Sequence, residues 1–330
     1  MTIQNKASII IPTKNPGAVF HTVLSAVCSQ KTIFPFEILV IDSGSTDGTV
    51  DYVKSITDDR VRLHEIAPSE FGHGRTRNLA VSLTTGQYAV LITHDACPAS
   101  DAWLANLVRA ADQDDRIAGV FGRHIAYPEA SPLTTRELEM HFAGFAAAPL
   151  VSLDDPHRYV SDEGYRQYLH FFSDNNALIR RTAWEKIPYP DVDFAEDQIW
   201  AQKIIEAGWY KAYASDAVVF HSHNYSLFER LQRSFDESYA FFRLFGYRLC
   251  PNLRMLLKSW TALTVRDLHF ARASGFWRKA PTSVARAPLD NFMRVLGHYL
   301  GTRGDSLQPW TRKKLSRDHH VLTCSLKLKK

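Results

Sequence analysis

The sequence predicts an α/β protein with a mostly parallel sheet, helices on both faces of that sheet, and a helical extension at its C-terminal end. Over the first two thirds of the chain, short apolar runs alternate with segments of helical spacing, which is typical of βα units. Two of the apolar runs end abruptly in an acid, at Asp42 and Asp95. From Ser226 onward the pattern is helical only. We therefore expect a first domain over residues 1–224 and an extension over residues 225–330.

The elements of the first domain follow from the length of each apolar run and from the glycines, prolines and polar loops that end it. In chain order they are a strand at 7–12, a helix at 19–30, a strand at 36–42, a helix at 50–55, a strand at 61–66, a helix at 77–84, a strand at 88–93, a helix at 101–112 and a strand at 117–126.

The middle of the chain is less regular. Residues 127–170 are rich in Pro, Asp and aromatic residues, which favours loops and short helices over the sheet. The elements expected beyond this stretch are a strand at 172–179, a helix at 194–207, a strand at 211–220, and amphipathic helices at 227–245, 252–272 and 289–300, with Pro281, Pro288 and Pro309 at the joints.

Composition limits the class of protein. The 330 residues are 45% hydrophobic, which is enough for one large core or for a core with an appendage. The four cysteines are scattered and form no CxxC pair, which argues against a disulfide framework or a zinc site and fits a reducing compartment. No secretory signal is visible, and no window reaches about 18 uncharged apolar residues. We expect a cytoplasmic protein without a spanning helix.

The formal net charge of +4 conceals two halves of opposite sign. Residues 1–224 hold 19 Lys and Arg against 28 Asp and Glu, and residues 225–330 hold 20 against 7. The basic extension could lie on an anionic membrane surface, since its cations alternate with Phe, Leu and Trp. It could equally pack on the first domain or on a second copy of the chain. Nucleic-acid binding is disfavoured because no recognised nucleic-acid motif accompanies the charge.

Asp42 and Asp95 lie where buried strands end, and this is where open α/β sheets bind ligands. We interpret Asp95 as the ligand of a divalent cation that holds a nucleotide-sugar diphosphate. Asp42, followed by the glycine-containing loop 43–49, could accept a hydrogen bond from the imide N–H of a pyrimidine base. The alternative for both acids is an ordinary loop in which they cap the next helix.

Three further groups could take part in chemistry. The stretch Phe71–Asn78 combines two glycines with His73, Arg75 and Arg77, which suits a pyrophosphate, although a solvated charged turn is the alternative. Glu196 and Asp197 begin a predicted helix, where they either stabilise its dipole or supply a general base for an acceptor hydroxyl.

His221 and His223 follow the last predicted strand of the first domain. In an extended segment they would point to opposite sides, so we expect one of them to reach a metal beside Asp95. Mn²⁺ accepts a nitrogen ligand more readily than Mg²⁺. The alternative is a structural histidine.

These motifs resemble the family 2 inverting glycosyltransferases with the GT-A fold. The resemblance covers about residues 7–224 and rests on five motifs in the family's order: Ile9–Asn15, Val40–Thr49, Arg77-Asn78, Glu196-Asp197 and the late histidines. It implies a metal-dependent enzyme that uses a nucleoside-diphosphate sugar, with Asp197 as the catalytic base. One motif departs from the family pattern. The usual Asp-x-Asp is His94-Asp95-Ala96, and the loss of one carboxylate implies metal binding that is weaker or depends on histidine.

The resemblance also implies three sets of site residues. The nucleotide-sugar set is Pro12, Thr13, Asn15, Asp42, Gly44, Arg75, Arg77, Thr93, His94 and Asp95. The acceptor side is Asp174, Asn175, Asn176, Glu196 and Trp200, where a simple turn is the alternative for residues 174–176. The metal ligands, for Mg²⁺ or Mn²⁺, are Asp95, His221 and His223.

A narrower likeness is to bacterial rhamnosyltransferases, through Phe71–Asn78, Thr93–Ala96 and His221–Ser226. It implies dTDP-L-rhamnose as the donor and a polysaccharide or lipid-linked oligosaccharide as the acceptor, with attachment to the inner face of the cytoplasmic membrane or self-association as further expectations. Three alternatives stay open: the same fold with a UDP-sugar, a nucleotide-sugar-binding protein with a weakened site, and a basic membrane scaffold.

Overall fold

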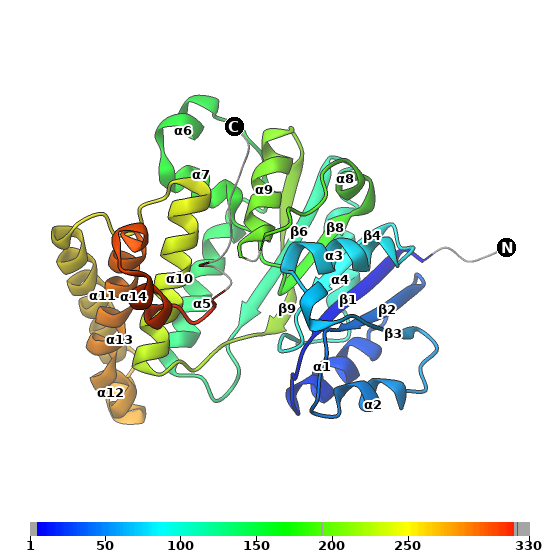
Figure 1. Cartoon of the computed structure of the whole chain (residues 1–330), viewed down its shortest axis with the longest axis horizontal. Helices are drawn as coiled ribbons and strands as arrows, with labels where there is room; N and C mark the ends of the chain where they lie inside the picture. Colours follow the sequence, from blue (N-terminus) through cyan, green and yellow to red (C-terminus); the bar gives the residue numbers. More distant parts are fainter. Residues whose placement is uncertain (1–4, 193, 320–321, 323–330) are drawn as a thin grey trace. The chain divides into compact units, whose positions relative to one another are not determined.

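The computed structural model describes residues 5–192, 194–319 and 322 of the chain, and these residues form two compact units (Figure 1). The first unit lies within Met1–Tyr127, Leu138–Val192 and Glu196–Ser222. The second lies within Pro128–Glu137, Asp193–Ala195 and His223–Lys330. Cys324 and the last residues of the basic region lie outside the described part of the chain, in which Cys28, Cys97 and Cys250 are free thiols.

The first unit is built on one sheet of nine described strands, in the order β3-β2-β1-β4-β8-β6-β9-β5, with β7 paired to β9. The strands are β1 (Ala7–Thr13), β2 (Phe36–Asp42), β3 (Val61–Glu65), β4 (Tyr88–Ile92), β5 (Cys97–Pro98), β6 (Ile117–Ile125), β7 (Leu150–Val151), β8 (Asn176–Arg180) and β9 (Tyr210–Phe220).

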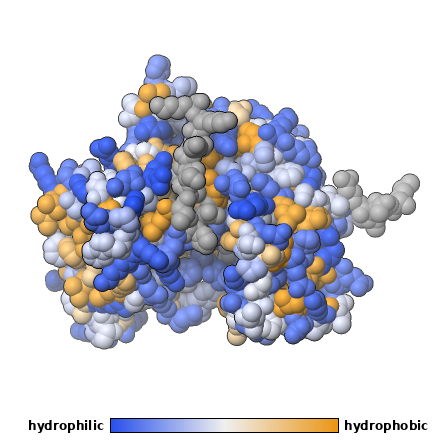
Figure 2. Space-filling view, in the orientation of Figure 1, coloured by the Kyte–Doolittle hydropathy of each residue, from blue (hydrophilic) through white to orange (hydrophobic). Residues whose placement is uncertain are grey.

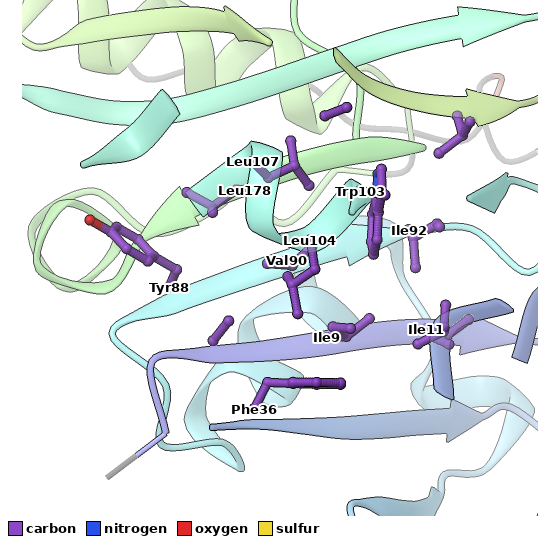
Figure 3. Packing of buried hydrophobic residues seen from close by; sticks show 14 of the residues in the cluster. Ile9, Ile11, Phe36, Tyr88, Val90, Ile92, Trp103, Leu104, Leu107 and Leu178 are labelled. Carbon is purple, nitrogen blue, oxygen red and sulfur yellow. The ribbon is translucent and has the colours of Figure 1, made fainter. Parts of the chain in front are cut away.

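The central strands are continuous apolar runs because helices cover both of their faces. On one face Ile9, Ile11 and Val90 pack against Trp103 and Leu104 of the following helix, as Figure 3 shows. The alternate residues of the same strands point to the other face, where they pack against a second set of helices. The predicted α/β fold with helices on both faces is therefore confirmed.

The sheet is parallel only in part. Strands β3, β2, β1 and β4 run parallel to one another, whereas β8 runs antiparallel to both of its neighbours, β4 and β6. An isolated apolar run carries no signal of its direction, so the sequence could not show that the chain reverses there.

The helices of the first unit match the predicted order with two differences. They are α1 (Val19–Cys28), α2 (Thr49–Lys54), α3 (His73–Ser82), α4 (Trp103–Ala111), α5 (Pro132–Ala146), α6 (Pro156–Ser161), α7 (Glu163–His170), α8 (Arg181–Lys186) and α9 (Glu196–Glu206), with a short 3₁₀ turn η1 (Pro68–Glu70). Helix α3 begins at His73, within the stretch predicted as a loop. Helix α5 has about four turns, whereas the sequence predicts loops and short helices in this region. Only the start of α5 belongs to the second unit.

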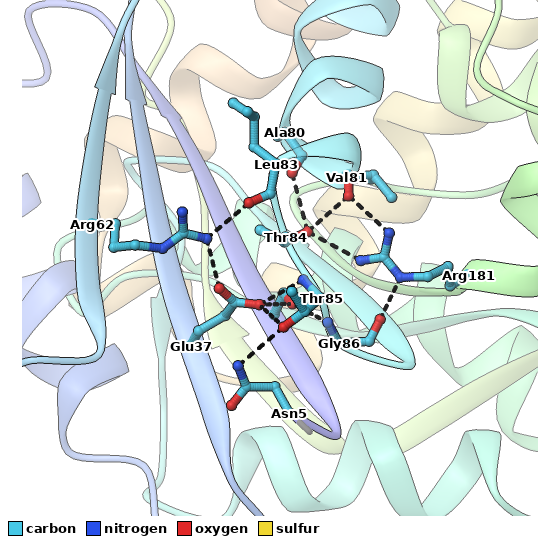
Figure 4. Close-up of polar contacts among 11 residues, drawn as sticks. Asn5, Glu37, Arg62, Ala80, Val81, Leu83, Thr84, Thr85, Gly86 and Arg181 are labelled. Atoms are coloured by element: carbon cyan, nitrogen blue, oxygen red, sulfur yellow. Dashed lines mark hydrogen bonds and ion pairs between the residues drawn. The ribbon is translucent and has the colours of Figure 1, made fainter. Parts of the chain in front are cut away.

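A buried carboxylate organises the amino-terminal edge of the sheet. Glu37 of β2 accepts hydrogen bonds from the Ser8 hydroxyl at 2.8 Å, from the Thr85 backbone at 2.7 Å and from Arg62 at 2.6 Å (Figure 4). Arg181 donates to the Gly86 carbonyl beside it at 2.6 Å. The cluster lies where the strands begin and ties β1, β2 and β3 to the loop before β4, so its role is structural.

The second unit is helical. Its helices are α10 (Leu227–Phe245), α11 (Leu253–Ala273), α12 (Phe276–Lys279), α13 (Pro281–Gly301) and α14 (Pro309–Leu315), with a 3₁₀ turn η2 (Gly304–Ser306). Helices α10 and α13 pack closely: a Cβ on Gly297 would come within 2.5 Å of the Leu231 carbonyl oxygen. Pro288, predicted at a joint, lies inside α13, where its carbonyl accepts a hydrogen bond from the Trp260 indole at 2.8 Å. Among the described helices, none has the length and apolar character that crossing a membrane requires.

Candidate active site

The carboxyl ends of β1 and β2 lie side by side, since Thr13 pairs with Asp42 in the parallel register. Asp42 is buried. Its Oδ1 accepts the backbone N–H groups of Gly44 at 2.9 Å and Ser45 at 2.8 Å, and its Oδ2 accepts the Thr13 hydroxyl at 3.1 Å. Asp42 therefore stabilises the loop after β2, which fits the alternative of an ordinary loop. It does not cap α2, which that alternative also expected. Recognition of a base by Asp42 stays a prediction.

The loops after β1 and β2 are tied to each other. The Asn15 side-chain oxygen accepts the Thr46 backbone N–H at 2.7 Å, and Asp47 accepts the Gly17 backbone N–H at 2.9 Å. Gly44 has a φ of 89°, and a Cβ there would come within 2.7 Å of the Pro68 ring. These contacts hold the loops after β1 and β2, next to Pro12 and Thr13, in one conformation. Such fixed loops suit a ligand that approaches the backbone closely.

Asp95 and His221 meet because Asp95 lies between β4 and β5, and β5 pairs with β9. Asp95 follows β4 and His221 follows β9, and Oδ2 of Asp95 lies 3.7 Å from Nε2 of His221. The Tyr127 hydroxyl donates to the Asp95 carbonyl at 2.9 Å. The Thr93 hydroxyl is buried and has no hydrogen-bond partner among the described residues, while the adjacent His94 is half-buried.

This pair has the chemistry of a cation site. A carboxylate oxygen and an imidazole nitrogen, both partly accessible, can each turn toward a shared divalent ion, and a mixed oxygen and nitrogen set suits Mn²⁺ better than Mg²⁺. His223 is the first residue of the second unit and follows His221 after a single residue. The prediction that it also reaches the ion is untested.

A cluster of three acids around one arginine lies in the same unit. Nε of Arg77 is 2.8 Å from Oδ2 of Asp174, and its Nη1 is 2.7 Å from Oε1 of Glu196. Tyr189 donates its hydroxyl to Oδ1 of Asp174 at 2.7 Å. Burial costs the Arg77 cation, but Asp174 and Glu196 outweigh this cost and raise the pKa of Arg77. The arginine is thus held permanently charged among acids.

Asp197 is the third acid and the more accessible one. Its carboxylate is half-buried at the start of α9, with Oδ2 3.4 Å from the Asp174 backbone N–H and Oδ1 2.8 Å from the Gln198 backbone N–H. Burial, followed by the charges of Asp174 and Glu196, raises the pKa of Asp197 well above its usual range. Burial likewise raises the pKa of Asp174 to about 6. A carboxylate with a raised pKa is a stronger base, which is the property that general-base catalysis needs.

The acid cluster and the Asp95–His221 pair are neighbours. Asp174, whose backbone contacts Asp197, is followed by Asn175, and Nδ2 of Asn175 lies 3.4 Å from Nε2 of His221. Asn175 therefore connects the two groups at the carboxyl edge of the sheet. The arrangement places a basic carboxylate beside a potential cation site, and this combination can deprotonate a hydroxyl next to a departing anion.

Four predicted site residues are buried, and other protein groups already engage their side chains. Arg77 is only 6% exposed and is engaged by the carboxylates of Asp174 and Glu196. Glu196, also buried, is held by Arg77. Asn176 is fully buried, accepting from Trp103 and donating to Ala217. Trp200 is fully buried and donates to the Ile187 carbonyl. The burial of these four side chains favours a structural role for each of them, and the roles predicted for them in the site stay predictions.

Arg75 differs from Arg77 in its surroundings. Its side chain is half-exposed, and its Nε lies 3.2 Å from the exposed carboxylate of Asp191. A pairing between two exposed groups is weak, so Arg75 can exchange Asp191 for a phosphate at little cost.

The structure adds residues that the sequence did not single out. Tyr189 holds Asp174 and stacks on Trp200, with ring centroids 5.4 Å apart. His124 lies at the end of β6 with its ring 5.4 Å from that of His221, and burial lowers its pKa well below the usual range, so it is neutral. Tyr189 stands in a proline-flanked turn and His124 within a strand, and neither position carries a pattern that indicates a site.

Comparisons with known proteins agree with this geometry. The profile of the family described as Glycosyl transferase family 2 matches residues 8–187. The O-antigen chain rhamnosyltransferase RfbN of Salmonella typhimurium is 32% identical, over 92% of this chain and 91% of its own length. The O-antigen chain rhamnosyltransferase WbaN of Salmonella anatum is 28% identical, over 91% and 90%.

Solved structures share the fold at low sequence identity. The mannosyltransferase PcManGT from Pyrobaculum calidifontis, in complex with GDP-Man and Mn²⁺, has a TM-score of 0.59 and 19% identity, over 93% of this chain and 89% of its own. S. aureus TarS in complex with UDP-GlcNAc has a TM-score of 0.51 and 17% identity, over 88% and 90%. The family match spans more than half of the chain, and the helical second unit accompanies a GT-A fold. We conclude that this chain is an inverting glycosyltransferase and belongs to glycosyl transferase family 2.

Proposed function

We propose that the chain transfers L-rhamnose from dTDP-L-rhamnose to a hydroxyl of a polysaccharide or lipid-linked oligosaccharide acceptor. The observation that carries the choice of sugar is that two relatives named as rhamnosyltransferases of the O-antigen chain align over nine tenths of this chain. An alignment of that length includes the acid cluster, the strand-end loops and the second unit together. We assign the transfer chemistry to residues 1–224 and a supporting role to residues 225–330.

Asp197 acts as the general base in this proposal. Its carboxylate accepts the proton of the acceptor hydroxyl as that oxygen bonds to the anomeric carbon of the sugar. The bond from the anomeric carbon to the diphosphate oxygen breaks on the opposite side, so the configuration inverts and dTDP leaves. Arg77, Asp174 and Glu196 position Asp197 and sustain its basicity, because the acids repel its charge while the arginine limits that repulsion.

A divalent cation fits the carboxylate of Asp95 and the imidazole of His221, with His223 as a third candidate. When bound, such an ion neutralises the charge that develops on the departing diphosphate. Asn175 contacts the His221 ring at 3.4 Å, and Arg75 can exchange its exposed partner Asp191 for a phosphate.

The test is a donor comparison with the purified chain. Release of the nucleoside diphosphate is measured with dTDP-L-rhamnose, dTDP-glucose, UDP-glucose and UDP-GlcNAc, in the presence of Mn²⁺ and an oligosaccharide acceptor pool. We expect turnover at least tenfold faster with dTDP-L-rhamnose than with any other donor. Faster turnover with a UDP-sugar would overturn the donor assignment and leave the enzyme class intact.

Removal of the cation tests the Asp95–His221 site. We expect EDTA to abolish donor turnover, and Mn²⁺ to restore it at lower concentration than Mg²⁺. Asp95→Ala should raise the Mn²⁺ concentration needed by at least tenfold, whereas Asp51→Ala on the exposed surface of α2 should not change it. Full activity in EDTA would contradict the metal assignment.

A further inference from the structure

The stretch that holds α11, α12 and the start of α13 is strongly basic. The 37 residues from Leu253 to Leu289 contain seven Lys and Arg and one acid, Asp267. That acid is buried and is engaged by Arg136, Arg266 and the Asn291 amide. The exposed side of these helices, as the structure describes it, therefore presents cations and no carboxylate.

The exposed cations lie on one side of α11. Arg254, Lys258 and Arg272 are exposed and follow one another at steps of four and fourteen residues, which return to nearly the same face of an α-helix. Val265 lies between them on that face and is 48% exposed. We name as the basic face six exposed residues of the two helices: Arg254, Lys258, Val265, Arg272, Trp277 and Arg278.

Large apolar side chains border these cations. Trp277 of α12 is 48% exposed, and Leu253 and Leu257 at the start of α11 are 61% and 56% exposed. Trp277 also lines a shallow hollow with Leu268 and Arg272. Figure 2 shows hydrophobic residues at the surface among hydrophilic ones in the α11 and α12 region. A tryptophan and leucines held in water beside cations are the composition of a surface that binds at a lipid headgroup boundary.

We propose that the basic face docks on a membrane surface that contains anionic lipid. Charge complementarity selects the occupant: the cations attract anionic headgroups, and the bordering leucines and Trp277 enter the boundary below them. A nucleic acid would satisfy the cations but leave the apolar border in water. Docking of this kind needs no spanning helix. The inference concerns the second unit and does not depend on which sugar the enzyme transfers.

The experiment measures co-sedimentation of the full chain with vesicles. Wild-type protein is mixed with phosphatidylcholine vesicles that either contain or lack phosphatidylglycerol. The buffer contains about 0.1 M NaCl, at which surface charges still act over about 10 Å. The test variant is K258E/R272E/R278E. The matched control is R109E/K186E/K203E, which makes the same change in net charge at exposed positions of the first unit.

We expect binding to the vesicles with phosphatidylglycerol and little binding to phosphatidylcholine alone. One cation near such a surface contributes roughly a fivefold change in partition, so the triple reversal should lower it on the order of 100-fold, and the control should stay within about threefold of wild type. Trp277→Ala should lower the partition onto the phosphatidylglycerol-containing vesicles severalfold, although it changes no charge. Equal binding to both vesicle types, equal loss in the control, or unchanged binding of the test variant would overturn the proposal. Matching thermal melting curves show that all variants are folded.

Discussion

Both units bury arginine among acids, but in different proportions. In the first unit Arg77 faces three acids, Asp174, Glu196 and Asp197, so the cluster holds more negative than positive charge. In the second unit the acids are matched. Arg294 forms a two-point pair with Glu137, with Nη2 2.7 Å from Oε2, and Arg230 lies 3.2 Å from Asp290.

The imbalance changes the acids themselves. The pKa of Asp174 is raised to about 6 and that of Asp197 is raised well above its usual range, with burial as the main cause of both shifts. The pKa of Glu137 is lowered, because the charge and hydrogen bonds of Arg294 outweigh the effect of burial. Arginine and acid in equal number stabilise a fold, whereas a surplus of buried acid makes a base. Charge balance alone therefore distinguishes the acid cluster around Arg77 from the cluster around Arg294, and we expect the acid cluster to be the reactive one.

The largest expected effect comes from removing the base. Asp197→Asn should lower kcat for sugar transfer by roughly 10³-fold, the scale that a general base contributes. It should also leave the melting temperature unchanged or raise it at pH 8, because a buried charge repelled by two others disappears. The matched control, Asp51→Asn on α2, should change neither quantity. A variant with more than a tenth of wild-type kcat would show that another group takes the proton.

The next largest effect should be on the free energy of unfolding, and it comes from removing the arginine that the acids share. Arg77→Met leaves Asp174 and Glu196 buried without a partner, and we expect a loss of about 3–5 kcal/mol in the free energy of unfolding at pH 8. The loss should be smaller at pH 5, where the acids take up protons. Chemical denaturation at both pH values measures it. Adding Asp174→Asn and Glu196→Gln should restore part of the stability, and a failure to do so would mean that Arg77 acts through packing.

The two clusters also show where reading the sequence succeeds. The end of β2 and the start of α9 were predictable, since an apolar run stops at Asp42 and since Glu196 and Asp197 open α9. The partner of a buried charge was not. Arg77 is separated from Asp174 by 97 positions and from Glu196 by 119. A cation near glycines has the same local pattern whether it faces a phosphate or is buried among carboxylates, and only tertiary packing decides between them.

The antiparallel direction of β8 has the same origin. Its five residues, Asn176 to Arg180, are all buried. The sequence of a fully buried strand does not indicate whether the strand runs parallel or antiparallel to its neighbours. That reversal brings Asp174 and Asn175 to the carboxyl edge of the parallel strands, between Asp197 and His221. The contacts that Asp174 and Asn175 make with Asp197 and His221 thus depend on a change of strand direction that no short motif indicates.

A smaller effect is a shift along the pH axis. The base must be deprotonated, so kcat/KM should fall as pH decreases, with an acidic limb well above pH 4, where an ordinary aspartate would place it. Glu196→Gln removes a negative neighbour of Asp197, which lowers the pKa of Asp197 and should move this limb to lower pH. Profiles of kcat/KM between pH 4.5 and 8.5 measure the shift. A limb that moves upward in the variant would contradict the electrostatic account.

The raised pKa values also fix the sign of a stability change. Because folded Asp174 and Asp197 bind protons more tightly than they do in the unfolded chain, their contribution to the free energy of unfolding is most favourable at low pH. It declines as pH rises from the unfolded pKa near 4 through the raised folded pKa values, that of Asp174 being about 6. In the Asp174→Asn/Asp197→Asn double variant this part of the pH dependence of unfolding should disappear.

The smallest expected effect is in the balanced cluster of the second unit. Arg294→Met makes the same substitution as Arg77→Met, but the acid left behind, Glu137, keeps 41% of its side chain exposed and can be hydrated. We expect a loss of only about 1 kcal/mol in the free energy of unfolding, close to the value of a partly exposed ion pair, with kcat unchanged. Denaturant titrations of the two methionine variants at pH 8 give the comparison directly. Equal losses at Arg77 and Arg294 would mean that neither the burial of the acids nor their surplus over arginine sets the cost, and charge balance would then no longer distinguish the acid cluster around Arg77 from the balanced cluster around Arg294.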